Sequence, residues 1–173
     1  AWYYSYTDRG LERVPTTKEE LSAVVNKYKG HLIATTACMG GELSTNALLA
    51  AMSKKVNDMN SAKGYERNID NFINFCVDLF GEDFYIECAP SKFEDQLTVN
   101  QELYWIANQY NIKMVVGTDA HYLTAAERPV HKAYLNSKGG EREVDSFYEF
   151  AHLMDSDEVT DLLSLCLPSS VIE

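Results

Sequence analysis

Long uninterrupted apolar runs are missing from the 173-residue chain. No stretch approaches the roughly 18 residues that a helix needs to span a bilayer. The first four residues also lack the basic stretch and apolar core of a secretion signal. These absences predict a cytoplasmic protein with no membrane contact. Because residue 1 is alanine and no cap or turn signal precedes the first aromatic residues, we expect a piece of a longer polypeptide.

Paired cysteines are missing as well. The four cysteines lie far apart, and no two of them form a C-x-x-C pair: Cys38, Cys76, Cys88 and Cys166. This spacing excludes a zinc ribbon and the disulfide framework of a small secreted domain. We therefore expect reduced thiols.

An excess of positive charge is the third absence. The 15 basic and 26 acidic side chains give a net charge of −11. A free-standing nucleic-acid binder is disfavoured, because neutralising phosphates requires a basic surface. Any contact with DNA has to come from another part of a longer protein. The acidic surface would suit a site that gathers divalent cations, but an ordinary solvated surface explains it equally well.

Hydrophobic residues make up 46% of the chain, which is enough for one packed domain. Apolar residues at helical spacing predict helices over residues 17–29, 42–59, 65–80 and 93–110. The first of these helices opens with a capping box, Thr17 to Glu20. Short β-prone runs lie at residues 31–37, 83–88 and 112–118. This alternation is typical of parallel βαβ units, so we predict an α/β fold with mainly parallel strands.

The remainder of the chain has a weaker pattern. We predict a helix from the residues after Leu123 to about Asn136 and a break at residues 138–140. The acidic stretch over residues 141–158 predicts loop with one or two short helices. A last apolar helical segment, residues 159–167, is expected to stop at Pro168.

Candidate metal ligands follow the ends of the predicted strands. Cys38 follows the first strand, and Glu87 lies near the end of the second. Asp119 and His121 follow the third. The C-terminal ends of parallel strands meet at one rim, where ligands and metals bind. An extended Asp-x-His segment presents both side chains to one side, and carboxylate, imidazole and thiolate suit zinc or manganese.

Each candidate also has a purely structural interpretation. An Asp-x-His pair after a strand is as often a helix cap followed by an ordinary histidine. Cys38 alone is more often a small buried hydrophobic residue. Glu87 could cap a helix or pair with a lysine. The other histidines are interpreted as solvated or structural: His31, His131 and His152.

Three segments together resemble a known family. HLIATTACMGGEL, residues 31–43, resembles the strand and cysteine-containing turn of the PHP domain in C-family DNA polymerases, the bacterial DNA polymerase III alpha-subunit type. FYIEC, residues 84–88, resembles the next strand of that family, and IKMVVGTDAHYL, residues 112–123, resembles its penultimate motif. The later order, a helix with His131, a Lys-Gly turn and a Phe-Tyr pair at residues 147–148, is similar too. The resemblance covers about residues 15–165.

The resemblance implies a partial (β/α) barrel of PHP type, with residues 1–173 as a single fragment of that domain. Its parts are a leading segment and helix (1–30), a strand-helix-strand core (31–123) and a helical, acidic tail (124–173). It implies that Cys38, Asp119 and His121 are metal-ligand positions, with Glu87 as a candidate supporting residue. In an intact site, two or three zinc or manganese ions, or magnesium, would activate a hydroxide for phosphoester hydrolysis.

The chain also departs from the family pattern. PHP domains begin with a His-x-His strand and further ligands, whereas residues 1–30 contain no histidine, and the polymerase palm is absent. We therefore expect the C-terminal part of the domain, with weak metal binding at most. DNA synthesis and 3′–5′ exonuclease proofreading or pyrophosphate hydrolysis would belong to the parent polymerase, whose remaining chain is the expected partner. The alternatives are a non-catalytic module that braces the polymerase core or binds a partner subunit, and a free-standing PHP phosphatase.

Overall fold

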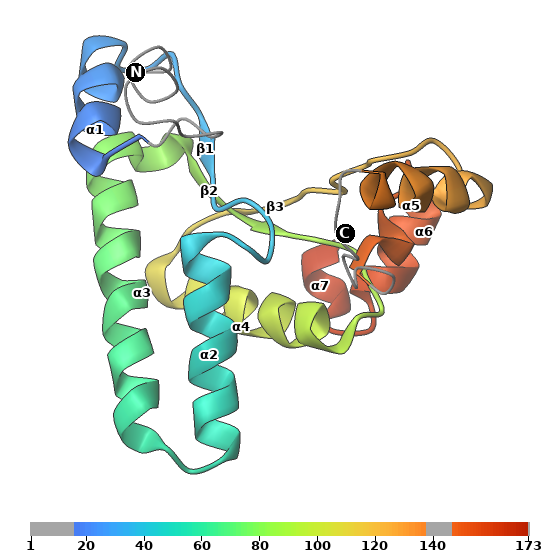
Figure 1. Ribbon diagram of the computed structural model, residues 1–173. Coiled ribbons are helices and arrows are strands. Elements are labelled where there is room, and N and C mark those ends of the chain that lie inside the picture. The colour runs from blue at the N-terminus through green and yellow to red at the C-terminus, as the bar shows by residue number, and fades with distance from the viewer. Residues whose placement is uncertain (1–15, 138–146, 173) are drawn as a thin grey trace.

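The computed structural model of the protein describes residues 16–137 and 147–172 (Figure 1). The predicted break at residues 138–140 and most of the acidic stretch after it lie outside the described residues. The helices are α1 (Lys18–Lys27), α2 (Glu42–Lys55), α3 (Met59–Phe80), α4 (Glu94–Tyr110), α5 (Arg128–Asn136), α6 (Ser156–Leu163) and α7 (Ser169–Ile172). The strands are β1 (Ala34–Thr35), β2 (Phe84–Cys88) and β3 (Met114–Val116), and single 3-10 turns cover Gly81–Asp83, Ala125–Glu127 and Phe147–Phe150.

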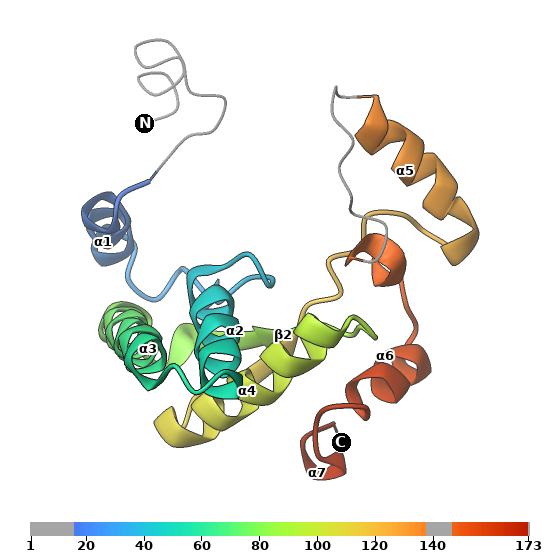
Figure 2. The same cartoon turned by 60° about the horizontal axis from the view of Figure 1, so that its bottom comes forward.

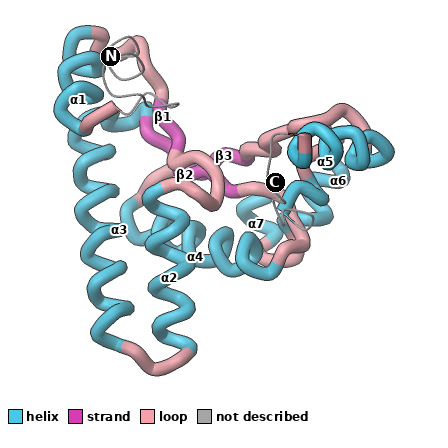
Figure 3. Tube along the Cα trace, in the orientation of Figure 1, coloured by secondary structure: helices cyan, strands magenta, loops and turns pink. Residues whose placement is uncertain are grey.

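The three strands form one parallel sheet in the order β1-β2-β3 (Figure 3). Thr35 pairs with Tyr85 on one edge of β2, and Glu87 pairs with Val115 on the other. The chain crosses from β1 to β2 through α2 and α3, and from β2 to β3 through α4. The predicted α/β fold with parallel strands is confirmed, as an open sheet that does not close into a barrel.

The core lies where α2, α3 and α4 meet the sheet. Helix α2 packs along α3 and also against α4, and α4 contacts β2 (Figures 1 and 2). The buried apolar residues of this core are Leu43, Ala47, Ile69, Ile73, Cys76, Phe84, Ile86, Val99, Leu103, Ile106 and Ala107. Most of them recur at the helical spacing that predicted these helices. Burying them is the main source of stability for this half of the molecule.

Several element boundaries differ from the prediction. Helix α2 ends before residue 59, because Asn57 adopts a left-handed backbone with φ of 59°. Asp58 then caps α3 by accepting the backbone N–H of Ser61 at 3.1 Å, so α3 starts earlier than predicted. The capping box at Thr17 is confirmed, with both reciprocal bonds formed. Strands β1 and β3 are shorter than predicted, and Ile33 just before β1 is exposed.

The predicted helix over residues 159–167 is wrong in both bounds. Helix α6 begins at Ser156, because the Asp155 carboxylate accepts the N–H groups of Asp157 and Glu158. The Glu158 carboxylate accepts the N–H of Asp155 in return, which completes a capping box. Helix α6 ends at Leu163, and Pro168 precedes α7 instead of stopping α6.

A second apolar cluster attaches α6 and α7 to the sheet. Its buried members are Cys88, Leu163 and Leu167. The buried Asn100 of α4 reinforces this attachment, because its side-chain amide donates to the carbonyl of Ala89 at 2.8 Å and to the Cys166 sulfur at 3.5 Å. All four cysteines are free thiols, as predicted. Within the described ranges, no helix is both long and apolar enough to cross a membrane.

Two isoleucines that differ in exposure test where the core lies. Ile86 of β2 is 0% exposed, whereas Ile33 is 71% exposed. We expect Ile86→Ala to lower the free energy of unfolding by about 2–5 kcal/mol, because it removes buried methyl groups and leaves a cavity. The matched change Ile33→Ala should cost less than about 0.5 kcal/mol. Urea denaturation followed by circular dichroism measures both, and equal losses would contradict the placement of the core.

Candidate functional site

Cys38 sits in a tight turn just beyond the C-terminal end of β1. The backbone N–H of Gly41 donates to the carbonyl of Cys38 at 2.8 Å and closes the turn. A Cβ atom at Gly41 would lie 2.5 Å from the carbonyl oxygen of Thr36, so this turn requires glycine. The turn holds the half-buried Cys38 side chain at the strand end where the sequence predicted it.

Glu87 connects the ends of all three strands. Its carboxylate accepts the hydroxyl of Thr35, from β1, at 2.6 Å. Its backbone N–H donates to the hydroxyl of Thr36 at 2.9 Å. On the other side, a Cβ atom at Gly117 would lie 2.1 Å from a carboxylate oxygen of Glu87. The glycine after β3 therefore leaves the space that the Glu87 side chain occupies.

The prediction that Asp119 and His121 lie on an extended segment is wrong. Asp119 adopts a left-handed backbone with φ of 45°, a conformation that aspartate tolerates better than most residues. This kink directs the Asp119 carbonyl at Nδ1 of His121, 2.6 Å away. The Asp119 carboxylate lies 3.9 Å from the same nitrogen. The two side chains are adjacent, but through a bend instead of through strand alternation.

The bond to the Asp119 carbonyl fixes the proton of His121. A carbonyl oxygen only accepts, so Nδ1 carries a proton; in the neutral ring, Nε2 then keeps its lone pair. A backbone carbonyl on one ring nitrogen is a common way to prepare the other nitrogen as a metal ligand. The local geometry of His121 is therefore suited to binding a metal through Nε2.

Cys38 and Asp119 meet at one small cavity. Its volume is about 40 Å³, and its lining includes Cys38, Thr118, Asp119 and, from the tail, Tyr148 and Ala151. His121 and Glu87 do not line it. Within residues 16–137 and 147–172, no group of three or more His, Cys, Asp or Glu side chains lies close enough together to hold a metal ion. The fold thus brings two of the four predicted residues to one cavity.

His131 lies beside the predicted ligand His121, although the sequence suggested only a solvated or structural role for it. The centroid of its ring is 5.3 Å from that of His121, and Tyr148 lies 5.0 Å from both rings. Burial lowers the pKa of His131, and the nearby charge of His121 lowers it further. Helix α5 carries His131, and the 147–150 turn carries Tyr148. The packing of these separate segments brings the rings together, so no local sequence signal could have revealed the contact.

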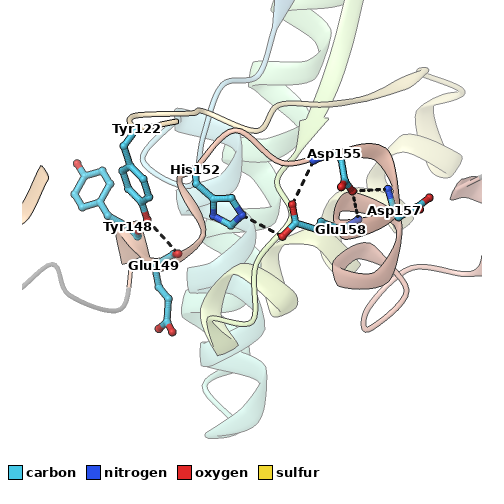
Figure 4. Close-up of polar contacts among 7 residues, drawn as sticks. All are labelled: Tyr122, Tyr148, Glu149, His152, Asp155, Asp157 and Glu158. Carbon is cyan, nitrogen blue, oxygen red and sulfur yellow. Dashed lines mark hydrogen bonds and ion pairs between the residues drawn. The ribbon is translucent and has the colours of Figure 1, made fainter. Parts of the chain in front are cut away.

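The tail also holds the backbone of the Asp-x-His segment. The N–H of His121 donates to the carbonyl of Ala151 at 2.7 Å, and the N–H of Leu153 donates to the carbonyl of Tyr122 at 3.0 Å. The Tyr122 hydroxyl donates to backbone carbonyls of the 147–150 turn, and its ring stacks on His152 (Figure 4). His152 in turn lies 3.3 Å from the Glu158 carboxylate of α6. Residues 148–158 therefore fix the position of the motif.

Comparison with known proteins reveals relatives along most of the chain, although no protein-family profile matches it. The chain is 43% identical over 160 residues, 92% of its length, to the probable DNA polymerase YorL of Bacillus subtilis (strain 168). It is equally similar to the DNA-directed DNA polymerase of Bacillus phage SPbeta. The chain is related to DNA polymerases. The DNA polymerase III subunit alpha of Aquifex aeolicus is a more distant polymerase relative, 30% identical over 112 residues and 65% of this chain.

These polymerase relatives are much longer than the chain. The matched segment spans 12% of the two Bacillus proteins and 8% of the Aquifex protein. The predicted relationship to DNA polymerases is confirmed. The finer assignment to their PHP domain, and the metal-ligand roles, stay predictions.

The contact between Gly117 and Glu87 can be tested by a double-mutant cycle. We expect Gly117→Ala to destabilise the chain by about 1–3 kcal/mol, because the added methyl group overlaps the Glu87 carboxylate. Glu87→Ala removes that overlap, so the double variant should lose less stability than the sum of the single variants. Gly64→Ala is the control, because a Cβ there meets nothing within 4 Å. Additive losses in urea denaturation would disprove the contact.

Proposed function

We propose that the chain is part of a PHP-type domain in a replicative DNA polymerase of the polymerase III alpha-subunit type. The observation that carries the proposal is the meeting of Cys38 and Asp119 at one cavity, beyond the C-terminal ends of β1 and β3, in a chain related to polymerases. That edge of a parallel sheet is where functional sites of α/β folds gather. The activity of the whole polymerase would be DNA-directed DNA synthesis.

The types of these residues suit a divalent metal, but the described residues supply too few ligands to hold one ion. A thiol at Cys38, a carboxylate at Asp119 and the free Nε2 of His121 are ligands suited to zinc or manganese, and less to magnesium. The described residues do not complete a set of three around one point, so no hydrolytic step follows from them alone. We propose that they form part of a site that the rest of the polymerase completes. Phosphoester hydrolysis, such as 3′–5′ proofreading, would then require the whole domain.

A specific observation favours a second function, a non-catalytic module that braces the polymerase core. Several features of the motif serve its own structure: the Asp119 carbonyl binds His121, and the backbone of His121 and Tyr122 pairs with the tail. Such bonds would be needed even without a metal. In either function, the net charge of −11 leaves DNA binding to other parts of the polymerase. A free-standing phosphatase ranks below both, because the relatives are polymerases.

Metal titration of the isolated chain tests whether its ligands are incomplete. We expect no submicromolar binding of Mn²⁺ or Zn²⁺ by calorimetry, because too few ligands are present. Alkylation of Cys38 by iodoacetamide at pH 8 gives a second readout, since a bound metal would protect this thiol. Cys76 and Cys88 serve as internal controls, because burial raises the pKa of each thiol to about 11 and keeps both slow to react.

Two matched variants show whether any metal binding in that titration depends on the Asp119 carboxylate. Asp119→Asn removes the carboxylate charge while keeping a residue that tolerates the left-handed backbone. Asp78→Asn makes the same change on an exposed position of α3. Submicromolar binding that Asp119→Asn abolishes and Asp78→Asn preserves would show that the chain holds a complete site, contrary to the expectation.

The same variants in the complete polymerase separate the catalytic from the bracing function. If the site hydrolyses phosphoesters, Asp119→Asn should reduce removal of 3′-terminal nucleotides at least tenfold, roughly the effect of losing even an outer partner of a metal site, and leave DNA synthesis unchanged. If the module only braces the polymerase, hydrolysis should not change. Gel assays of primer extension and primer degradation measure the two activities. Asp78→Asn should affect neither.

A further inference from the structure

A cavity on the helical side of the molecule lies apart from the Cys38–Asp119 cavity and shares none of its lining. Its volume is about 480 Å³, and residues of α2, α3 and α4 line it. The lining residues discussed below are Lys54, Glu66, Ile69, Asp70, Glu102, Trp105, Ile106 and Tyr110. Neither the predicted metal ligands nor the relationship to polymerases explains this cavity.

One wall of the cavity is an exposed aromatic side chain. Trp105 is 65% exposed, although its neighbours on α4, Leu103 and Ile106, are 0% and 7% exposed. Tyr110, five residues further along α4, is half-buried and donates its hydroxyl to the carboxylate of Asp70. A tryptophan that stays in water next to a cavity offers a large flat surface for a ligand.

The floor and rim of the cavity differ in chemistry. Ile69 and Ile106 form an apolar floor, and both are buried. Three carboxylates, Glu66, Asp70 and Glu102, stand around it with a single ammonium group, that of Lys54. Lys54 is already paired with Glu66 at 2.9 Å, so the other two carboxylates leave an excess of negative charge. In agreement, the hydrogen bond to Glu66 and the charge of Glu102 raise the pKa of Lys54.

We propose that this cavity binds an arginine side chain presented by another polypeptide segment. The guanidinium plane would stack on Trp105 and donate to the carboxylates of Glu102 and Asp70. Its methylene stem would cover the apolar floor, as long cationic side chains do on apolar surfaces. Arginine fits better than lysine, because its planar, weakly hydrated head can stack and donate at the same time. Phosphates would be repelled, which argues against a nucleic acid.

Binding of a designed peptide tests the proposal on the whole chain. The probe is a dye-labelled, capped peptide of glycine and alanine with two arginines, and its partner carries the neutral isostere citrulline at both positions. Fluorescence anisotropy should show at least about fivefold tighter binding of the arginine peptide, because the citrulline peptide loses its charge contacts. The preference should shrink as salt concentration rises.

Substitutions of the lining residues show whether each side chain strengthens or weakens binding of the arginine peptide. Trp105→Leu should weaken binding of the arginine peptide about threefold, because a cation–π contact is lost. Glu102→Gln should also weaken it about threefold. Lys54→Gln should tighten binding, since it removes the competing ammonium group and frees Glu66. Glu94→Gln, the same change on the exposed first turn of α4, is the control and should have no effect.

Four results would overturn the proposal. The first is equal affinity for the arginine and citrulline peptides, and the second is unchanged peptide binding by Trp105→Leu while its circular dichroism matches the parent chain. The third is tighter binding of Mg²⁺ than of peptide at this site. The fourth is displacement of the peptide by a second copy of the chain at high concentration. The last two would assign the cavity to a cation or to self-association.

Discussion

Parallel pairing on both edges of β2 is the constraint on which the rest of the structure depends. Parallel neighbours cannot be joined by a tight turn, so each pair needs a long crossover, and both crossovers here run through helices. Those helices supply the apolar faces that cover the sheet. The same pairing aligns the C-terminal ends of the strands, which is why Cys38, Glu87 and Asp119, far apart in sequence, lie at one edge. Fold and candidate site thus follow from the same hydrogen-bond pattern.

Features determined by nearby residues could be predicted from the sequence. The alternation of strands and helices, the capping box at Thr17 and the positions of the candidate ligands at strand ends were all available from local pattern. Element boundaries were less accurate, because they depend on single residues such as Asn57, whose left-handed backbone ends α2. Asp155 was missed as a helix cap, although its spacing to Glu158 is a readable signal.

Features that depend on distant contacts could not be predicted. The pairing of His121 with Ala151 and the packing of His131 against His121 require α5 and the tail to fold back onto the motif. Neither residue in such a contact lies in a local sequence pattern that would indicate its partner. Trp105 illustrates the same limit, because its helical position predicts only which face it occupies. Its exposure beside a cavity is decided by how α2 and α3 pack against α4.

The bend at Asp119 gives this residue two separable duties. Asp119 lines the small cavity with a side chain that could bind a metal, while its carbonyl places the proton of the neutral His121 ring on Nδ1. The second duty depends only on a left-handed backbone, which asparagine or glycine also adopts readily. A polymerase could therefore lose the acidic function at this position and still keep the imidazole oriented. The orientation of His121 therefore depends on main-chain geometry at position 119. It would persist even if the carboxylate at that position were lost.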